Sequence, residues 1–189
     1  MKFLDAILGR SQPKRPDLDQ LFGLPQAALT LQAAADFRPT GVGSVCYRAA
    51  EGGAFATTQA DIQELLDADE GPKVERVSDD YGFTWLVIRH DPEDSSGLVT
   101  DLHAVNSSLE AAGFGPFLLC SLVTFVNGDG RRLALVYLYK RGAFYPFAPL
   151  SGERRDNALE LQTRGMVAND LKIEQDLSRW FPVWGAPGL

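Results

Sequence analysis

The sequence has few residues that bind metals or act as nucleophiles. It contains 2 cysteines and 2 histidines among 189 residues, and none of the four is close to another, so a zinc site is not expected. Cys46 and Cys120 lie in apolar, strand-like segments, where a free cysteine usually behaves as a small buried hydrophobe. A Cys/His nucleophilic pair remains the alternative, although a reactive thiol needs an exposed, electropositive setting.

Long hydrophobic runs are also missing. The longest, over residues 115–126, is interrupted by Ser121 and Thr124 and is shorter than the roughly 18 to 20 residues that a membrane span needs. Near the start, Asp5 interrupts the apolar residues and no small-residue cleavage site follows, so we expect no secretory signal. The expected location is the cytoplasm.

Phosphate-binding motifs are not evident. No lysine follows a glycine directly, and the glycines at residues 40–44 lack the third glycine and the helix of a dinucleotide loop. The formal net charge is −7, whereas nucleic-acid binding needs clustered basic residues. We therefore expect no cofactor and no nucleic-acid partner.

The charges are unevenly distributed along the chain. Residues 51–101 contain 13 acidic and three basic residues, whereas residues 127–155 contain six basic and two acidic residues. Such polarity favours oriented docking on a partner. The simpler alternative is that these charges only solvate exposed faces.

The first residues have the pattern of a short amphipathic helix, expected over residues 1–9. Its apolar face would consist of Phe3, Leu4, Ile7 and Leu8. Residues 10–16 contain two prolines and read as a linker. Basic residues near the helix would assist contact with an anionic membrane surface or a partner: Arg10, Lys14 and Arg15. The alternative is that the helix packs on its own domain.

The remaining chain, residues 17–189, is expected to form a single α+β domain with an aromatic C-terminal tail. Helical spacing is found at residues 55–66 and most clearly at 96–112, where Ser95 or Ser96 could cap the helix. A helix is also expected from Glu153 to about Asn169.

Strands are expected in short hairpins between these helices. They are predicted at residues 43–48, 73–78, 83–90, 117–126, 131–140 and 143–147. The short connections favour a largely antiparallel sheet of five to six strands with helices packed on it.

Two aromatic segments are candidate partner contacts. Tyr137 and Tyr139 alternate on one strand face, which fits either a docking surface or an ordinary core strand. Trp180, Phe181 and Trp184 lie in a tail limited by prolines. Such a tail either folds back over a core edge or serves as a docking peptide.

Several long strings resemble one family. They are MKFLDAILGR, RPTGVGSVCYRAAEG, HDPEDSSGLVTDLHAVNSSLE, RRLALVYLYKRGAFYPFAPL and LSRWFPVWGAPGL. Together they are similar to the actinobacterial PspA-associated protein PspAB family over nearly the whole chain. The resemblance implies an accessory protein of the phage-shock envelope-stress system, acting alongside PspA, a coiled-coil protein at the inner face of the cytoplasmic membrane. It implies no catalytic residues.

The order of elements is also similar to the secretion-chaperone-like α+β fold, whose members bind polypeptides, although fold does not fix function. Our leading hypothesis is a non-enzymatic adaptor that binds a PspA-like coiled-coil protein and an anionic membrane surface. The alternatives are a small Cys/His or acid-base hydrolase and a secretion-type chaperone. The sequence leaves a homodimer open.

Deleting residues 1–10 should leave folding intact and abolish binding to anionic liposomes or to a PspA-type protein, because the apolar helix face would be lost. Co-sedimentation of the intact and shortened chains measures this. Unchanged binding would contradict a role for the N-terminal segment.

Overall fold

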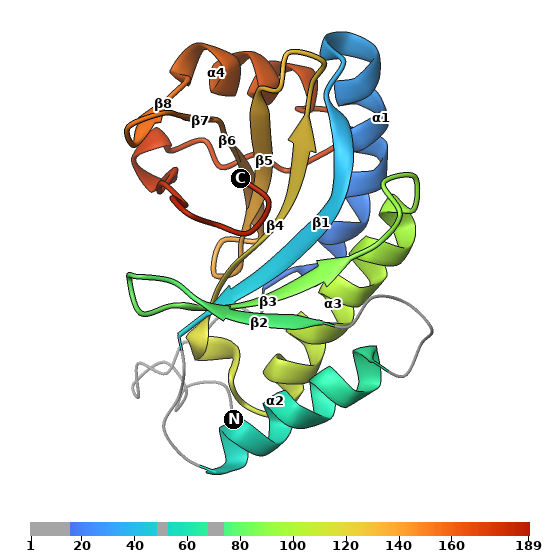
Figure 1. Cartoon of the computed structure of the whole chain (residues 1–189), viewed down its shortest axis with the longest axis vertical. Coiled ribbons are helices and arrows are strands. Elements are labelled where there is room, and N and C mark those ends of the chain that lie inside the picture. Colours follow the sequence, from blue (N-terminus) through green and yellow to red (C-terminus); the bar gives the residue numbers. More distant parts are fainter. Residues whose placement is uncertain (1–15, 49–52, 68–73) are drawn as a thin grey trace, which may run out of the picture.

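The computed structural model describes residues 16–48, 53–67 and 74–189 (Figure 1). Its helices are η1 (Leu18–Gly23), α1 (Leu24–Ala35), α2 (Gly53–Leu66), α3 (Ser95–Ala111), η2 (Gly115–Phe117), α4 (Asn157–Met166) and η3 (Leu177–Arg179). Its strands are β1 (Arg38–Tyr47), β2 (Glu75–Ser78), β3 (Thr84–Arg89), β4 (Leu118–Val126), β5 (Arg132–Leu138), β6 (Ala143–Phe147), β7 (Pro149–Leu150) and β8 (Arg154–Arg155).

The strands confirm the expected α+β class. Six of them form one sheet in the order β2-β3-β1-β4-β5-β6, and every neighbouring pair is antiparallel. The small β7-β8 hairpin forms a second sheet. β1 lies in the middle of the large sheet. After β1 the chain forms α2 and returns through β2 and β3, which lie on one side of β1; it then forms α3 and places β4 on the other side.

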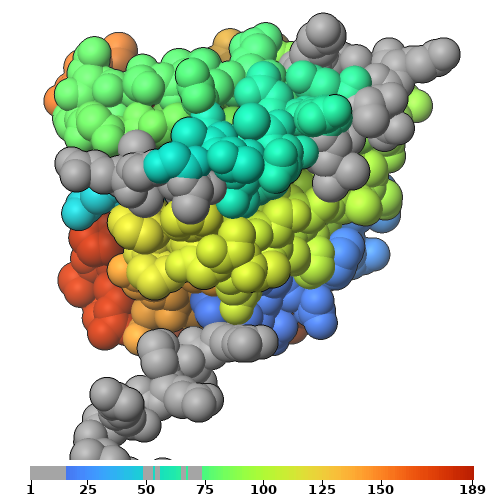
Figure 2. Space-filling model, turned by 90° about the horizontal axis from the view of Figure 1, so that it is seen from below, coloured from blue at the N-terminus to red at the C-terminus, as the bar shows by residue number. Residues whose placement is uncertain are grey.

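One side of the sheet, called the helix face, is covered by α1 and α3. Gly43 permits close packing there, because a Cβ at this position would lie 3.0 Å from a Leu98 side-chain carbon. Asn106 of α3 is buried and donates to Ser121 Oγ of β4 at 2.8 Å. In Figure 2, the teal surface of α2 lies beside the yellow-green surface of α3, against which it packs.

The opposite side, called the tail face, is crossed by residues 172–189, called the tail. The tail begins by pairing with the outer edge of β6, where Phe144 N donates to Lys172 O and Glu174 N donates to Phe144 O, both at 2.8 Å. It then crosses the sheet, and Gly188 lies close to Thr124 of β4. Of the two alternatives for this segment, the structure has the one in which the tail folds back over the core.

Element boundaries differ from the expected ones for local reasons. Asp94, rather than Ser95 or Ser96, caps α3, because its Oδ1 accepts from Gly97 N at 2.8 Å.

The last helix begins at Asn157 instead of Glu153, because the β7-β8 hairpin precedes it and Asp156 caps it by accepting from Leu159 N. Pro25 lies in the first turn of α1, where its missing N–H costs no hydrogen bond.

The expected N-terminal helix and linker, with Phe3, Leu4, Ile7, Leu8, Arg10, Lys14 and Arg15, lie outside the described residues. Their roles stay predictions.

Gly41 should be essential for joining β1 to the end of β3. Its φ is +77° and an added Cβ would lie 2.2 Å from the His90 carbonyl oxygen. We expect Gly41→Ala to lower the free energy of unfolding by about 2 to 5 kcal/mol, from left-handed strain plus overlap with backbone. Urea denaturation measures this.

Gly130→Ala is the matched control, since Gly130 has a φ of +76° and open space around its Cβ position. It should lose only about 1 to 2 kcal/mol. Equal losses in the two variants would show that the close approach to His90 is unimportant.

Candidate binding pocket

An apolar pocket of about 590 Å³ opens on the tail face of the sheet. Its floor consists of sheet side chains: Cys46, Trp85, Leu119, Cys120, Leu138 and Tyr145. One wall is the turn between β2 and β3, with Tyr81 and Phe83, and the other is the tail from Arg179 to Trp184. Its size and lining are typical of sites that bind small molecules or an apolar group of a larger partner.

The floor follows from the register of four neighbouring strands. Trp85 pairs with Cys46, Cys46 with Cys120, and Cys120 with Leu138, which places one residue from each strand in a single row. Next to this row the β1-β4 register shifts, since Cys46 pairs with Cys120 but Tyr47 pairs with Leu118. The extra residue, Leu119, is directed into the pocket as the unpaired residue of a β-bulge.

Asp79 fixes the wall formed by the β2-β3 turn. One carboxylate oxygen accepts from Tyr81 N and Phe83 N, each at 2.9 Å, and the other accepts from Trp85 Nε1 at 2.9 Å. The turn is thereby tied to the pocket floor. The bond from Trp85 to Asp79 has no sequence signal, because it depends on which way the indole faces.

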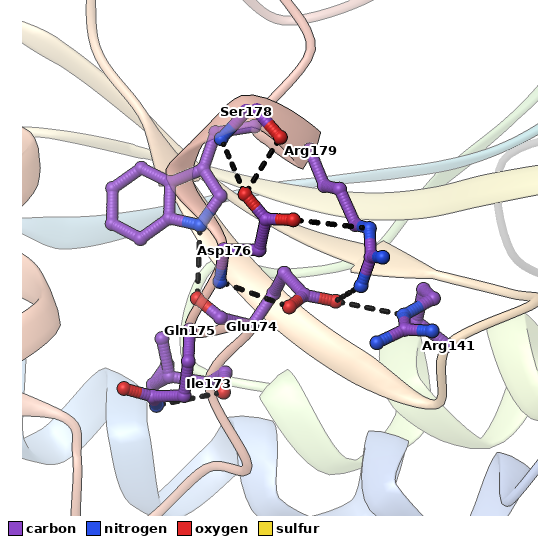
Figure 3. Close-up of polar contacts among 8 residues, drawn as sticks. Arg141, Ile173, Glu174, Gln175, Asp176, Ser178 and Arg179 are labelled. Atoms are coloured by element: carbon purple, nitrogen blue, oxygen red, sulfur yellow. Dashed lines mark hydrogen bonds and ion pairs between the residues drawn. The ribbon is translucent and has the colours of Figure 1, made fainter.

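Glu174 fixes the opposite wall (Figure 3). Its carboxylate accepts from Arg141 Nε at 2.9 Å and from Asp176 N at 3.0 Å, and Arg179 lies 3.8 Å away. Burial raises the pKa of this carboxyl, but the Asp176 N–H and the Arg141 guanidinium outweigh that effect and hold the pKa below its ordinary value. The tail is thus ionically attached to the turn between β5 and β6.

The tail aromatics divide into two anchors and one exposed ring. Trp180 is buried, donates from Nε1 to Glu174 O at 3.0 Å and stacks on Tyr145 at 6.1 Å between ring centroids. Trp184 packs edge-on against Phe147 at 4.9 Å. Phe181, between them, is 59% exposed at the mouth of the pocket.

The other predicted contact residues, Tyr137 and Tyr139, are 0% and 4% exposed. Tyr137 points to the helix face, where its hydroxyl donates to Asp17 O at 2.8 Å. Burial leaves neither ring a surface for the expected partner contact. Tyr137 lies in β5, an inner strand covered on both faces, whereas Tyr139 directly follows that strand and lies close to Gly115. The core-strand alternative describes this segment.

The two thiols on the pocket floor are in an unreactive setting. Cys46 and Cys120 are free and buried. The neighbouring Cys120 thiol and burial raise the pKa of Cys46 far above its ordinary value, so the nucleophilic thiolate is disfavoured. Neither histidine is among the residues that line this pocket.

His90 instead joins the end of β3 to α3. Its Nδ1 lies 3.0 Å from Asp94 Oδ2 and its Nε2 lies 2.8 Å from Asp101 Oδ2. Burial lowers the pKa of this imidazole, but the hydrogen bonds to Asp101 and Asp94 outweigh it and raise the pKa above its ordinary value. The sequence alone does not reveal this cluster, because its only local signal is the spacing of His90 and Asp94.

Within residues 16–48, 53–67 and 74–189, no group of three or more His, Cys, Asp or Glu side chains is arranged to hold a metal ion. No helix among these residues has the length and apolar character of a membrane span.

A family model described as PspA associated protein B matches residues 1–188. The chain belongs to this family. No curated protein and no solved structure matches it, so the likeness to the secretion-chaperone fold stays a prediction. The family name associates the chain with PspA and fits an accessory protein of the phage-shock system.

The His90 cluster should make stability depend on pH. Because the pKa of His90 is raised on folding, its contribution is fully present below pH about 6.5 and is lost as the pH rises through the raised value. We expect His90→Asn to lower the free energy of unfolding by about 1 kcal/mol more at pH 5.5 than at pH 8.5. Urea denaturation at the two pH values measures this.

His103→Asn is the matched control. His103 lies 3.3 Å from Asp19, whose side chain is 85% exposed, so a smaller pH-dependent difference is expected. A loss for His90→Asn that is the same at both pH values would rule out a charged imidazole between the two aspartates.

Proposed function

We propose that this chain is a non-enzymatic accessory protein of the phage-shock response that binds a PspA-like coiled-coil protein at the mouth of the apolar pocket. Membership of the PspA associated protein B family supports the choice of partner. The choice of surface rests on one observation: two large aromatic side chains, Tyr81 and Phe181, are 58% and 59% exposed on the two walls of this pocket.

Exposed aromatic groups beside an apolar depression are typical of the energetic centre of a protein interface. Both walls are fixed by hydrogen-bonded carboxylates, Asp79 on one side and Glu174 on the other. A surface that is already ordered loses little conformational freedom when a partner binds. A helix of a coiled coil could therefore place apolar side chains between the two rings.

A binding role also fits the chemistry of the pocket better than the hydrolase alternative. Ionisation of the Cys46 thiol is disfavoured by burial and by its neighbour Cys120, and no histidine lines the pocket to activate either thiol. His90 does reach carboxylates, but it is held on both ring nitrogens and lies outside the pocket lining. The proposal also includes contact of residues 1–10 with an anionic membrane surface, which co-sedimentation of the shortened chain tests, and formation of a homodimer, which the molar mass in solution tests.

Phe181→Ala should weaken binding to a purified PspA-type coiled-coil protein by about tenfold or more, because truncating an aromatic residue at an interface centre typically costs 2 kcal/mol or more. Isothermal titration calorimetry measures the Kd. The substitution removes an exposed ring and should not change the fold.

The matched control is Phe22→Ala. Phe22 is 50% exposed and packs on His103 of α3, away from the pocket, so its loss should change the Kd by less than about twofold. Equal affinities for the wild type and Phe181→Ala would refute the proposed surface. If the wild type failed to bind at all, direct association with PspA would be refuted.

A further inference from the structure

Below the two exposed rings, the pocket has a deeper interior of different character. The strand residues of its floor are apolar or neutral, and the polar group of Trp85 is already bonded to Asp79. Cationic side chains are found at one end, where Lys140, Arg141 and Arg179 contribute to the lining, and Asp79 lies on the opposite wall. The pocket therefore combines an uncharged cavity with a cationic edge.

We propose that this pocket binds a single-chain amphiphile with an anionic head group, of the fatty-acid type, with the chain on the Cys46–Cys120 floor and the head group at Lys140 and Arg141. The inference rests on the pocket itself and does not depend on the identity of a protein partner.

The cationic edge has spare capacity for an anion. Lys140 is exposed, and the described part of the chain offers it no ion pair. Arg141 donates from Nε to Glu174, and its terminal NH₂ groups have no acceptor among the described residues. Both residues lie in the turn between β5 and β6, so a carboxylate could accept charge-assisted hydrogen bonds from the two together.

Nearby negative charge does not cancel Lys140. Arg141 and Arg179 are paired with Glu174 and Asp176, and among the described residues Lys140 is left as the uncompensated cation of this edge. Asp79 is the acidic residue of the pocket lining, and both of its oxygens accept hydrogen bonds from the turn and from Trp85. It lies on the opposite wall from Lys140. An anionic head group is thus favoured at the β5-β6 turn over a cationic one.

The interior suits an acyl chain in size and rigidity. About 590 Å³ lies within the usual range for ligand pockets. The tail stays in place without a ligand because Trp180 and Trp184 are packed on Tyr145 and Phe147. An apolar chain entering a preformed cavity gains burial at no cost of ordering the walls.

The natural fluorescence of the protein provides the assay. The chain has 3 tryptophans, of which Trp85 and Trp184 line the pocket and Trp180 stacks on the floor residue Tyr145. The purified full-length chain is titrated with decanoate, below its micelle-forming concentration, and with decyltrimethylammonium as a cationic amphiphile of the same chain length. A saturable change with decanoate, at least about tenfold tighter than with the cation, is expected.

Charge reversal tests the head-group site. Lys140→Glu should weaken decanoate binding by about tenfold or more, whereas Lys172→Glu, an exposed lysine away from this pocket, should change it by less than about twofold. Leu119→Phe, which fills the floor, should weaken both amphiphiles. Its folding is checked by circular dichroism, and the two lysine variants decide the question if it does not fold.

Three results would overturn the proposal: no saturable change with decanoate, equal affinity for the two amphiphiles, or equal effects of the two lysine substitutions. The last two would leave an apolar cavity that does not select a head group, as expected if it receives only an apolar side chain of a protein partner. Because the assay contains no partner, its failure leaves the proposed binding of PspA untouched.

Discussion

The tail face depends on one buried carboxylate. Glu174 is 5% exposed, and it is compensated from two directions by Arg141 of the β5-β6 turn and by the Asp176 N–H of the tail. Removing a single partner from such a cluster is costly, because the remaining charge stays buried. The same residue continues the sheet through its backbone, since Glu174 N donates to Phe144 O. One position therefore sets both where the tail begins and how it leaves the sheet.

The two faces of the sheet are covered in different ways, and this difference creates the pocket. On the helix face, α1 and α3 supply continuous apolar stripes, and Gly43 allows the α3 leucines to approach the backbone closely. On the tail face, a proline-containing segment whose regular structure is the short η3 takes the place of a long helix. It contacts the sheet at Trp180 and Trp184 and leaves the Cys46–Cys120 end uncovered. The pocket thus results from incomplete coverage of an otherwise complete sheet.

The sequence predicted the parts of this fold that depend on local pattern. The helical spacing over residues 96–112 corresponds to α3, and the short hairpins expected over residues 73–90 and 117–147 correspond to β2-β3 and to β4-β5-β6. The cap of α3 was misplaced by one or two residues because Asp94, Ser95 and Ser96 are all good capping residues. Tyr137 alternates as expected, but alternation alone does not reveal that both faces of β5 are covered.

The candidate site was not predictable in the same way. Its floor brings together residues from four strands far apart in the chain, and it depends on a register shift at Leu119 that has no sequence signal. The His90 cluster likewise requires that β3 end beside α3. Trp180, Phe181 and Trp184 were identified as candidates from composition. Which of them would be buried was decided by the anchor at Glu174, 6 to 10 residues away.

The pairing of the tail with β6 also affects how the sheet could associate with other chains. Unpaired strand edges are the places where sheets extend into neighbouring molecules. At β6 that edge is already occupied by residues 172–174. In the described part of the chain, the sheet's other outer strand is β2, which has 4 residues, all exposed, and includes both Glu75 and Arg76. A short, charged edge of this kind resists the addition of a strand. The architecture therefore protects the protein from edge-to-edge aggregation at both ends of its sheet, at one end by its own chain and at the other by length and charge.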